Sequence, residues 1–246
     1  MEKSIVRKFA IRVVDGVGLG GVARRAKENG WAPWTPLVPE GAFRACCRTA
    51  IETLRRHGAD EAIGDYLEFG VSRGTSLACM HQALDRAGLR RVRLFGFDSF
   101  EGLPPEAAGE GWRPGAFRST EGATRRYLDR AGVDWSRVTL VKGWFRDTLT
   151  DGARDRLGLR KASLIMVDCD TYAASLECLR FCEPLIRDRA VVFLDDWGND
   201  PNDQGEKRAF TEFLADCPHF SAEPLPAYAP AARVFLVTRR PNAPPA

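Results

Sequence analysis

Aspartates gather in two short segments of the chain, at residues 168–170 and 195–196. Each segment directly follows an aliphatic run, residues 163–167 and 190–194, of the kind that forms a buried parallel strand. Ligands of an open α/β sheet bind beyond the carboxyl ends of its strands, so we expect these carboxylates to share one cleft. Clustered carboxylates repel one another unless protons or a cation offset their charge, and oxygen ligands suit Mg²⁺ or Ca²⁺. Helix capping would explain one aspartate per strand end, but not the adjacent pair. The pattern therefore favours a metal site.

A glycine-containing turn follows the first predicted strand, in the segment from Glu68 to Ser76. Its pattern is an acid followed by Gly70-x-x-x-Gly74, and it lacks the Gly-x-Gly-x-x-Gly spacing that seats a pyrophosphate on a helix N-terminus. An acid at this strand end suits a cationic group, and the two glycines allow a ligand to approach the backbone closely. A glycine loop that merely turns the chain is the alternative interpretation.

A second acid, Asp98, ends the next predicted strand. In nucleotide-binding folds an acid at this position commonly accepts hydrogen bonds from ribose hydroxyls. Asp98 therefore indicates a nucleoside, without distinguishing NAD from other nucleoside cofactors.

Strand and helix patterns alternate along most of the chain, which predicts a doubly wound α/β fold with a mostly parallel, seven-stranded sheet. We expect strands at 66–69, 92–97, 138–141, 163–167 and 190–194, helices at 76–87, 121–131, 174–182 and 206–215, and a late antiparallel edge at 222–225 and 233–238. Residues 1–60, with a helix at 40–57, are interpreted as an N-terminal helical cap or lid, 61–240 as the main domain, and 241–246 as a frayed tail.

The composition of the 246-residue chain is that of a globular protein, with 44% hydrophobic and 28% charged residues. Its net charge of +3 and interspersed basic residues give no indication of nucleic-acid binding. The sequence has no apolar stretch of ~18 residues and no apolar run of a signal peptide at its start, so we expect no membrane association. Seven cysteines without a Cys-x-x-Cys pair are interpreted as free thiols of a cytoplasmic protein.

With these residues in place, the chain resembles the macrocin O-methyltransferase family, whose members methylate sugar hydroxyls of macrolide antibiotics. The resemblance runs from about residue 66 to residue 214. It rests on Tyr66-Leu-Glu-Phe-Gly-Val71, Gly96-Phe-Asp-Ser-Phe-Glu-Gly-Leu-Pro104, Trp112-x-x-Gly115-x-Phe117, Lys142-Gly-Trp-Phe-x-Asp-Thr-Leu149, Asp168-x-Asp170-x-Tyr172 and Asp195-Asp196. The chain departs from the family at Cys169, at residues 173–175 and at Trp197, all on the side expected to receive the acceptor.

The resemblance implies a Rossmann-like methyltransferase fold, S-adenosylmethionine as the cofactor, a small-molecule acceptor from antibiotic biosynthesis, and Mg²⁺ held by Asp168, Asp195 and Asp196. The acid with Gly-x-x-x-Gly matches the first cofactor motif of such enzymes. The predicted cofactor-binding residues are Glu68, Phe69, Gly70, Ser72, Gly74, Thr75, Ser76, Asp98, Ser99, Gly143, Trp144 and Asp168.

The predicted catalytic residues are Asp168, Asp170 and Tyr172, because a sugar hydroxyl needs a base as well as a metal. Asp170 has an equally good interpretation as the N-cap of the helix that follows it. The three histidines lie in ordinary helix or loop contexts, and we expect none to be catalytic. The segment 101–120 is a candidate lid.

Aromatic residues supply candidate walls for the two ligands. Trp144 would lie near an adenine, Phe145 is better explained by core packing, and Trp112, Phe117 and Trp197 are candidate walls for an acceptor.

Other functions compete with this prediction. A metal-independent methyltransferase acting on another nucleophile would share the fold and cofactor. An NAD-dependent oxidoreductase is disfavoured by the missing Gly-x-Gly-x-x-Gly and Tyr-x-x-x-Lys patterns. An inactive binding subunit would be expected to have lost some of Glu68, Gly70, Asp98 or the aspartate cluster, and the chain has them all.

The apolar residues of segment 31–38 indicate that the protein self-associates. Trp31, Trp34, Leu37 and Val38 would form an exposed apolar patch in a monomer, so we expect a homodimer or a larger homo-oligomer.

Overall fold

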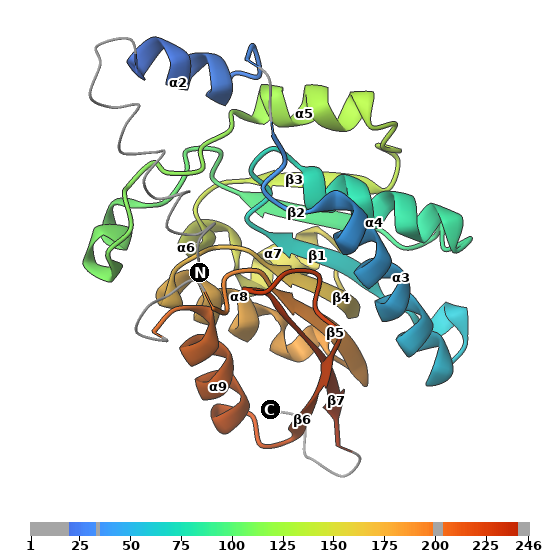
Figure 1. Cartoon of the computed structure of the whole chain (residues 1–246). Coiled ribbons are helices and arrows are strands. Elements are labelled where there is room, and N and C mark those ends of the chain that lie inside the picture. Colours follow the sequence, from blue (N-terminus) through green and yellow to red (C-terminus); the bar gives the residue numbers. More distant parts are fainter. Residues whose placement is uncertain (1–19, 33–34, 199–203, 241–246) are drawn as a thin grey trace.

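The computed structural model describes residues 20–32, 35–198 and 204–240 of the chain. These residues form a seven-stranded sheet in the order β3-β2-β1-β4-β5-β7-β6, in which only β7 runs against the others (Figure 1). The strands are β1 (Asp65–Phe69), β2 (Leu94–Asp98), β3 (Val138–Lys142), β4 (Ala162–Val167), β5 (Arg189–Leu194), β6 (Phe220–Leu225) and β7 (Arg233–Arg239). The predicted doubly wound, mostly parallel sheet is confirmed.

The four central strands end level with one another. Phe69, the last residue of β1, pairs with Phe97 of β2 and with Val167 of β4. Val167 in turn pairs with Leu194, the last residue of β5. This register brings the residues at the strand ends to one edge of the sheet, which is where ligands of an open α/β sheet bind.

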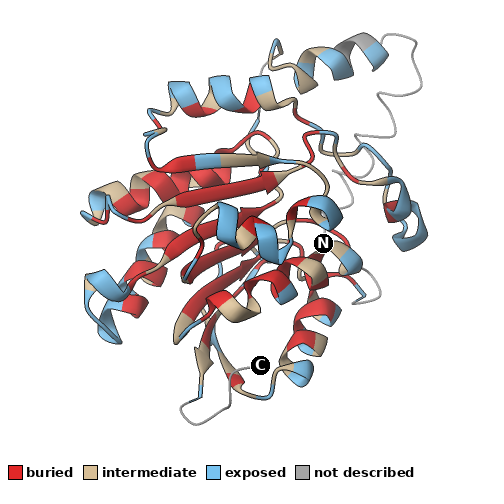
Figure 2. Cartoon of the chain, turned by 180° about the vertical axis from the view of Figure 1, so that it is seen from behind, coloured by how far each residue is buried: buried red, intermediate tan, exposed pale blue. Residues whose placement is uncertain are grey.

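Two hydrophobic cores lie on opposite faces of the sheet, because alternate strand residues point to opposite sides. One core joins Tyr66 and Phe193 to helices α3 (Glu40–Arg56), α4 (Thr75–Arg86) and α5 (Glu121–Arg130). The other joins Leu67 and Ile165 to helices α8 (Tyr172–Cys182) and α9 (Glu206–Asp216). Figure 2 shows the strands as an almost continuous buried layer between these helices.

Shorter helices complete the fold, and the sequence patterns did not predict them. They are α2 (Gly20–Glu28), α6 (Phe145–Thr148), α7 (Asp151–Arg156) and three 3₁₀ turns, η1 (Asp60–Ala62), η2 (Pro105–Glu110) and η3 (Glu183–Leu185). Helices α6 and α7 have only 4 and 6 residues, which is too few for a period of 3.6 to show. All seven cysteines are free thiols, as predicted.

The N-terminal region enters the fold through α3. Its Phe43, Cys47 and Ile51 are buried in the same core as α4 and β1. Val38 is also buried there, so its predicted place in an exposed patch is wrong; its short apolar side chain packs with α3. Trp31 and Leu37 are 76% and 45% exposed, and Trp34 lies outside the described residues. Within the described residues no helix is long and apolar enough to cross a membrane.

Candidate functional site

A cleft of about 280 Å³ opens at the carboxyl edge of the sheet. Its floor consists of residues at or just after the ends of β1, β2, β3, β4 and β5. These residues lie together because the paired strands end at the same edge of the sheet. The segment after β2 and the first turns of α6 and α8 form its walls. Among the predicted site residues, those that line the cleft are Gly70, Ser72, Asp98, Ser99, Gly143, Trp144, Asp168, Asp170 and Asp195.

Backbone contacts fix the floor of the cleft between β1 and β4. The Asp168 N–H donates to the carbonyl of Phe69 at 2.9 Å, and Gly70 adopts a φ of 92°. A Cβ atom on Gly70 would lie 1.8 Å from the carbonyl oxygen of Asp168. Glycine is therefore required at position 70 both for its backbone conformation and for space.

Asp98 organises the loop after β1. Its two carboxylate oxygens accept the Ser72 N–H at 2.7 Å and the Phe100 N–H at 2.6 Å. Ser72 and Phe100 both have positive φ values, 45° and 57°, which are strained for residues other than glycine. The hydrogen bonds to Asp98 stabilise both of these turns. Burial raises the pKa of Asp98, and these N–H groups oppose that rise. The carboxylate oxygens retain lone pairs and lie at the cleft.

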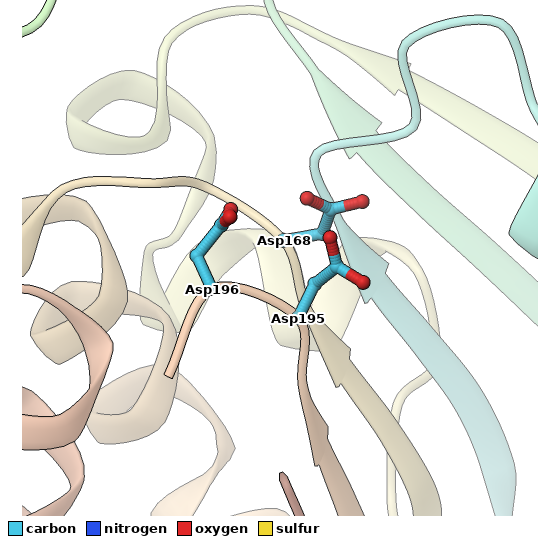
Figure 3. Close-up of side chains that lie close together, drawn as sticks. All are labelled: Asp168, Asp195 and Asp196. Atoms are coloured by element: carbon cyan, nitrogen blue, oxygen red, sulfur yellow. The ribbon is translucent and has the colours of Figure 1, made fainter. Parts of the chain in front are cut away.

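The aspartates after β4 and β5 form an acid cluster, shown in Figure 3. Asp168, Asp195 and Asp196 each place a carboxylate oxygen within 4.8 Å of the others. Burial, followed by the charges of Asp195 and Asp196, raises the pKa of Asp168 well above its usual value. Three oxygen donors converging from two adjacent strand ends fit a hard divalent cation such as Mg²⁺.

Two further residues support the acid cluster, and the sequence patterns did not reveal them. The Tyr228 O–H, from the loop between β6 and β7, donates to Asp195 Oδ1 at 2.5 Å. The carboxylate of Glu206, at the start of α9, accepts the Asp196 N–H at 2.9 Å. Both side chains are buried. Glu206 follows Asp196 by 10 residues and Tyr228 follows Asp195 by 33, and neither belongs to a local motif, so the fold brings them to the cluster.

Asp170 and Tyr172 lie on the same segment but point to different places. Asp170 lines the cleft, is 8% exposed and has a φ of 62°. The N-cap of α8 is Thr171, whose side chain accepts the Ala174 N–H, so the capping role considered for Asp170 belongs to its neighbour. The Tyr172 O–H donates to Glu212 of α9, and Tyr172 is absent from the cleft lining.

Glu68 lies beneath the cleft. Its carboxylate is fully buried under α4, where it accepts hydrogen bonds from the hydroxyls of Tyr66 and Ser76. Burial raises the pKa of Glu68 to about 8. Phe69 packs in the core, Gly74 precedes α4, and Thr75 and Ser76 begin that helix. None of these five residues lines the cleft, so their contribution is to shape the turn that does.

The candidate lid lines one side of the cleft and is held by hydrogen bonds and an ion pair at several points. Its two ends pair through Leu103 N–H to Ala116 C=O at 3.0 Å and Gly115 N–H to Leu103 C=O at 2.7 Å. Glu110, at the end of η2, accepts the Tyr172 N–H at 2.6 Å and so binds the first turn of α8. Glu106 pairs with Arg146 across the cleft at 3.1 Å.

The candidate aromatic walls divide into two groups. Trp144, Phe145 and Phe117 line the cleft, and Phe145 also packs edge-on against Phe69 in the core. Trp112 contacts Phe117 at a ring distance of 6.1 Å. Trp197 instead packs on Phe210 and Phe235, away from the cleft.

The histidines have structural partners. His81 Nε2 accepts the Asp134 N–H, His219 contacts Glu183, and His57 ends α3. None of the three lines the cleft.

The chain is similar to several known proteins. A family profile described as a methyltransferase domain matches residues 67–197, which contain the whole acid cluster. A tetracenomycin-C rhamnosyl 4'-O-methyltransferase of Streptomyces olivaceus is 30% identical over 151 residues, which cover 58% of this chain and 56% of the relative. Mycinamicin III 3''-O-methyltransferase of Micromonospora griseorubida is 26% identical over 60% of this chain and 59% of its own length. The chain thus spans little more than half the length of these curated relatives.

Solved structures share the fold. The O-methyltransferase NovP aligns with a TM-score of 0.66 at 21% identity, over 81% of this chain and 80% of that one. The calicheamicin methyltransferase CalS11 aligns with a TM-score of 0.60 at 23% identity, over 78% of both chains.

Proposed function

Because the chain belongs to a methyltransferase domain family, whose profile matches residues 67–197, we propose that the protein is an S-adenosylmethionine-dependent O-methyltransferase. Its proposed acceptor is a small molecule of the sugar type with vicinal hydroxyls, since the name of the tetracenomycin enzyme includes a rhamnosyl group. The observation that supports this best is that one cleft is lined by Asp98, suited to a ribose, and by Asp168 and Asp195, two members of the acid cluster.

The proposed cofactor end of the cleft consists of residues after β1, β2 and β3. Asp98 is oriented by two backbone N–H groups and still offers lone pairs to ribose hydroxyls. Trp144 provides a flat apolar wall for an adenine ring. Gly70 lines this end of the cleft and lets the loop after β1 pack directly against the backbone of Asp168. When bound, S-adenosylmethionine supplies a methyl group activated by a neighbouring sulfonium.

The proposed acceptor end lies at the acid cluster. A divalent cation would be held there by Asp168, Asp195 and Asp196. When bound, it would orient two acceptor hydroxyls and lower the pKa of the hydroxyl that reacts. Tyr228 and Glu206, which lie outside the cleft lining, form hydrogen bonds with Asp195 and Asp196. The candidate lid, joined to the first turn of α8 through Glu110, forms one wall of the cleft, where its proposed role is to restrict the access of water.

We assign the general base to Asp170. It lines the cleft beside the acid cluster, whereas the Tyr172 hydroxyl donates a hydrogen bond to Glu212 and Tyr172 is absent from the lining. The hydrogen bond to Glu212 also raises the pKa of Tyr172, which makes its phenolate harder to form. Asp170 would accept the proton of the acceptor hydroxyl, whose oxygen would take the methyl group while the bond between methyl and sulfur breaks and S-adenosylhomocysteine is left.

The proposal is tested first by ligand binding and then by turnover. Calorimetry should show S-adenosylhomocysteine binding more tightly than NAD. Incubation with labelled S-adenosylmethionine and a panel of rhamnose-type glycosides should then transfer label only to members with two adjacent free hydroxyls. Tighter binding of NAD, or labelling of a mono-ol panel at the same rate, would contradict the cofactor and acceptor assignments respectively.

We also propose that the protein is a homo-oligomer. Trp31, at 76% exposed, and Leu37, at 45% exposed, support this proposal, and Leu37 lies at the rim of the cleft. Light scattering at high concentration checks it, because a particle of monomer mass would rule it out.

A further inference from the structure

Glu206 has an unusual environment for a carboxylate. It is the first residue of α9, yet its side chain is 0% exposed. One oxygen, Oε2, accepts the Asp196 N–H at 2.9 Å. The other oxygen, Oε1, is buried and has no hydrogen-bond partner among the described residues. Burying a carboxyl group with half of its acceptors unused costs free energy, so a compensating role is expected.

Helix capping does not account for this burial. An acid in the first turn of a helix interacts favourably with the helix dipole, but it does so equally well when exposed to solvent. Glu121 and Asp151 begin α5 and α7 in this way without being buried. What distinguishes Glu206 is its contact with the backbone of the acid cluster.

Two backbone amides in the turn after β5 donate hydrogen bonds. The Asp195 N–H donates to the carbonyl of Val167 at 3.2 Å, which continues the ladder between β4 and β5. The next amide, that of Asp196, donates to Glu206 instead of to a strand. Glu206 therefore supplies the acceptor that a neighbouring strand would supply within the sheet. This hydrogen bond orients the backbone of Asp196 and so the direction of its side chain.

We propose that Glu206 is a positioning residue of the acid cluster, holding Asp196 so that its carboxylate converges with those of Asp168 and Asp195. The inference rests on the proposed function, in which the acid cluster binds a divalent cation. Residues that orient metal ligands from outside typically change metal affinity about 10-fold to 100-fold when they are replaced. Glu206 acts through a backbone amide, so its hydrogen-bond acceptor matters and its charge does not.

Two substitutions separate these contributions. Glu206→Ala removes the acceptor, whereas Glu206→Gln keeps a carbonyl oxygen that can accept the same N–H. Glu223→Ala is the matched control, since Glu223 is exposed on the edge strand β6. Mg²⁺ binding is measured by calorimetry, protection of the Asp196 amide by hydrogen exchange, and integrity of the fold by thermal melting and S-adenosylhomocysteine affinity.

We expect Glu206→Ala to bind Mg²⁺ about 10-fold to 100-fold more weakly and to lose protection at the Asp196 amide. Glu206→Gln and Glu223→Ala should keep both properties, and all folded variants should keep their S-adenosylhomocysteine affinity. Wild-type Mg²⁺ affinity in a folded Glu206→Ala protein would overturn the inference. Loss of affinity in Glu206→Gln with the amide still protected would also overturn it, because charge would then be the cause.

The design remains decisive in two difficult cases. If Glu206→Ala does not fold, the Gln variant carries the test, and a weakened Mg²⁺ affinity in it contradicts the inference. If the wild-type protein binds no Mg²⁺, the proposed metal centre is wrong, and amide protection at Asp196 alone decides whether Glu206 positions the turn.

Discussion

The carbonyl oxygen of Asp168 occupies the space that a side chain at Gly70 would need, because a Cβ there would approach it to 1.8 Å. The contact joins the loop after β1, proposed to receive the cofactor, to the first aspartate of the acid cluster. The obstructing atom belongs to the backbone, so it cannot move aside by a change of rotamer.

Gly70→Ala should therefore distort both halves of the site. The positive φ at residue 70 alone disfavours alanine by roughly 1–2 kcal/mol, and the collision adds to this cost. We expect a clear fall in melting temperature and loss of S-adenosylhomocysteine binding. Gly41→Ala in α3, where a Cβ meets nothing within 4 Å, should leave both unchanged or slightly improve stability. Equal behaviour of the two variants would contradict this reading of Gly70.

Asp98→Ala should weaken binding of S-adenosylhomocysteine. The loss expected is about 1.5–3 kcal/mol, the range for hydrogen bonds to a charged group. The substitution also frees the Ser72 and Phe100 amides, so stability must be measured alongside. Calorimetry on the variant, at a temperature where it is folded, gives the answer, and an unchanged affinity would remove Asp98 from the cofactor site.

Asp195→Asn and Asp196→Asn should lower Mg²⁺ affinity and turnover together. The fold should tolerate both changes, because neutralising one carboxylate also relieves repulsion within the cluster. Binding of S-adenosylhomocysteine should change little. The measurement is methyl transfer before and after chelation, with Mg²⁺ restored in a final step. Full activity of chelated wild-type enzyme would exclude a metal requirement and favour the metal-independent alternative.

Tyr228→Phe tests the hydrogen bond that Tyr228 donates to Asp195. The aromatic contact with Phe43 should persist, while the O–H donor is lost. We expect about 1 kcal/mol of lost stability and about 10-fold weaker Mg²⁺ binding. In an Asp195→Asn background the same change should have a much smaller effect on metal affinity. Additive losses in the double variant would show that Tyr228 acts independently of Asp195.

The buried Glu68 should make stability depend on pH. Its pKa is about 8 in the folded protein, against a usual value of 4.5, so between these values the folded state keeps a proton that the unfolded state has released. Stability from this group is fully present below about pH 4.5 and falls as pH rises to about 8, by a total on the order of 5 kcal/mol. Glu68→Gln keeps groups that can bond to Tyr66 and Ser76 but does not titrate. The free energy of unfolding, measured with urea at about pH 5.5, 7 and 8.5, should therefore fall less steeply with pH in the variant than in the wild type. An identical pH dependence of the two proteins would refute the prediction.

Sequence patterns predicted the sheet and the floor of the cleft well, for a physical reason. Buried parallel strands are continuous aliphatic runs, and their ends are level, so Asp98, Asp168 and Asp195 could be placed together from their positions after such runs. Short helices such as α6 carry too few residues for periodicity to reveal them.

Side-chain direction and long-range partners could not be predicted in this way. Tyr172 follows the same strand as Asp168, but it is the first residue of α8 and its ring faces α9. Tyr228 reaches Asp195 only because β7 reverses beside β5. Val38 looked exposed beside Trp31 because the sequence does not show that α3 covers it.

The strand order has a consequence for how the protein forms. β4 lies between β1 and β5, and its pairing with β1 joins Phe69 to Val167, residues far apart in the chain. To form this contact, the chain must lose the conformational entropy of a long loop before the pairing stabilises it. Pairings of this kind therefore form slowly. The cleft exists only in molecules that have completed this step. A ligand bound there thus stabilises the finished fold by mass action, without accelerating its assembly.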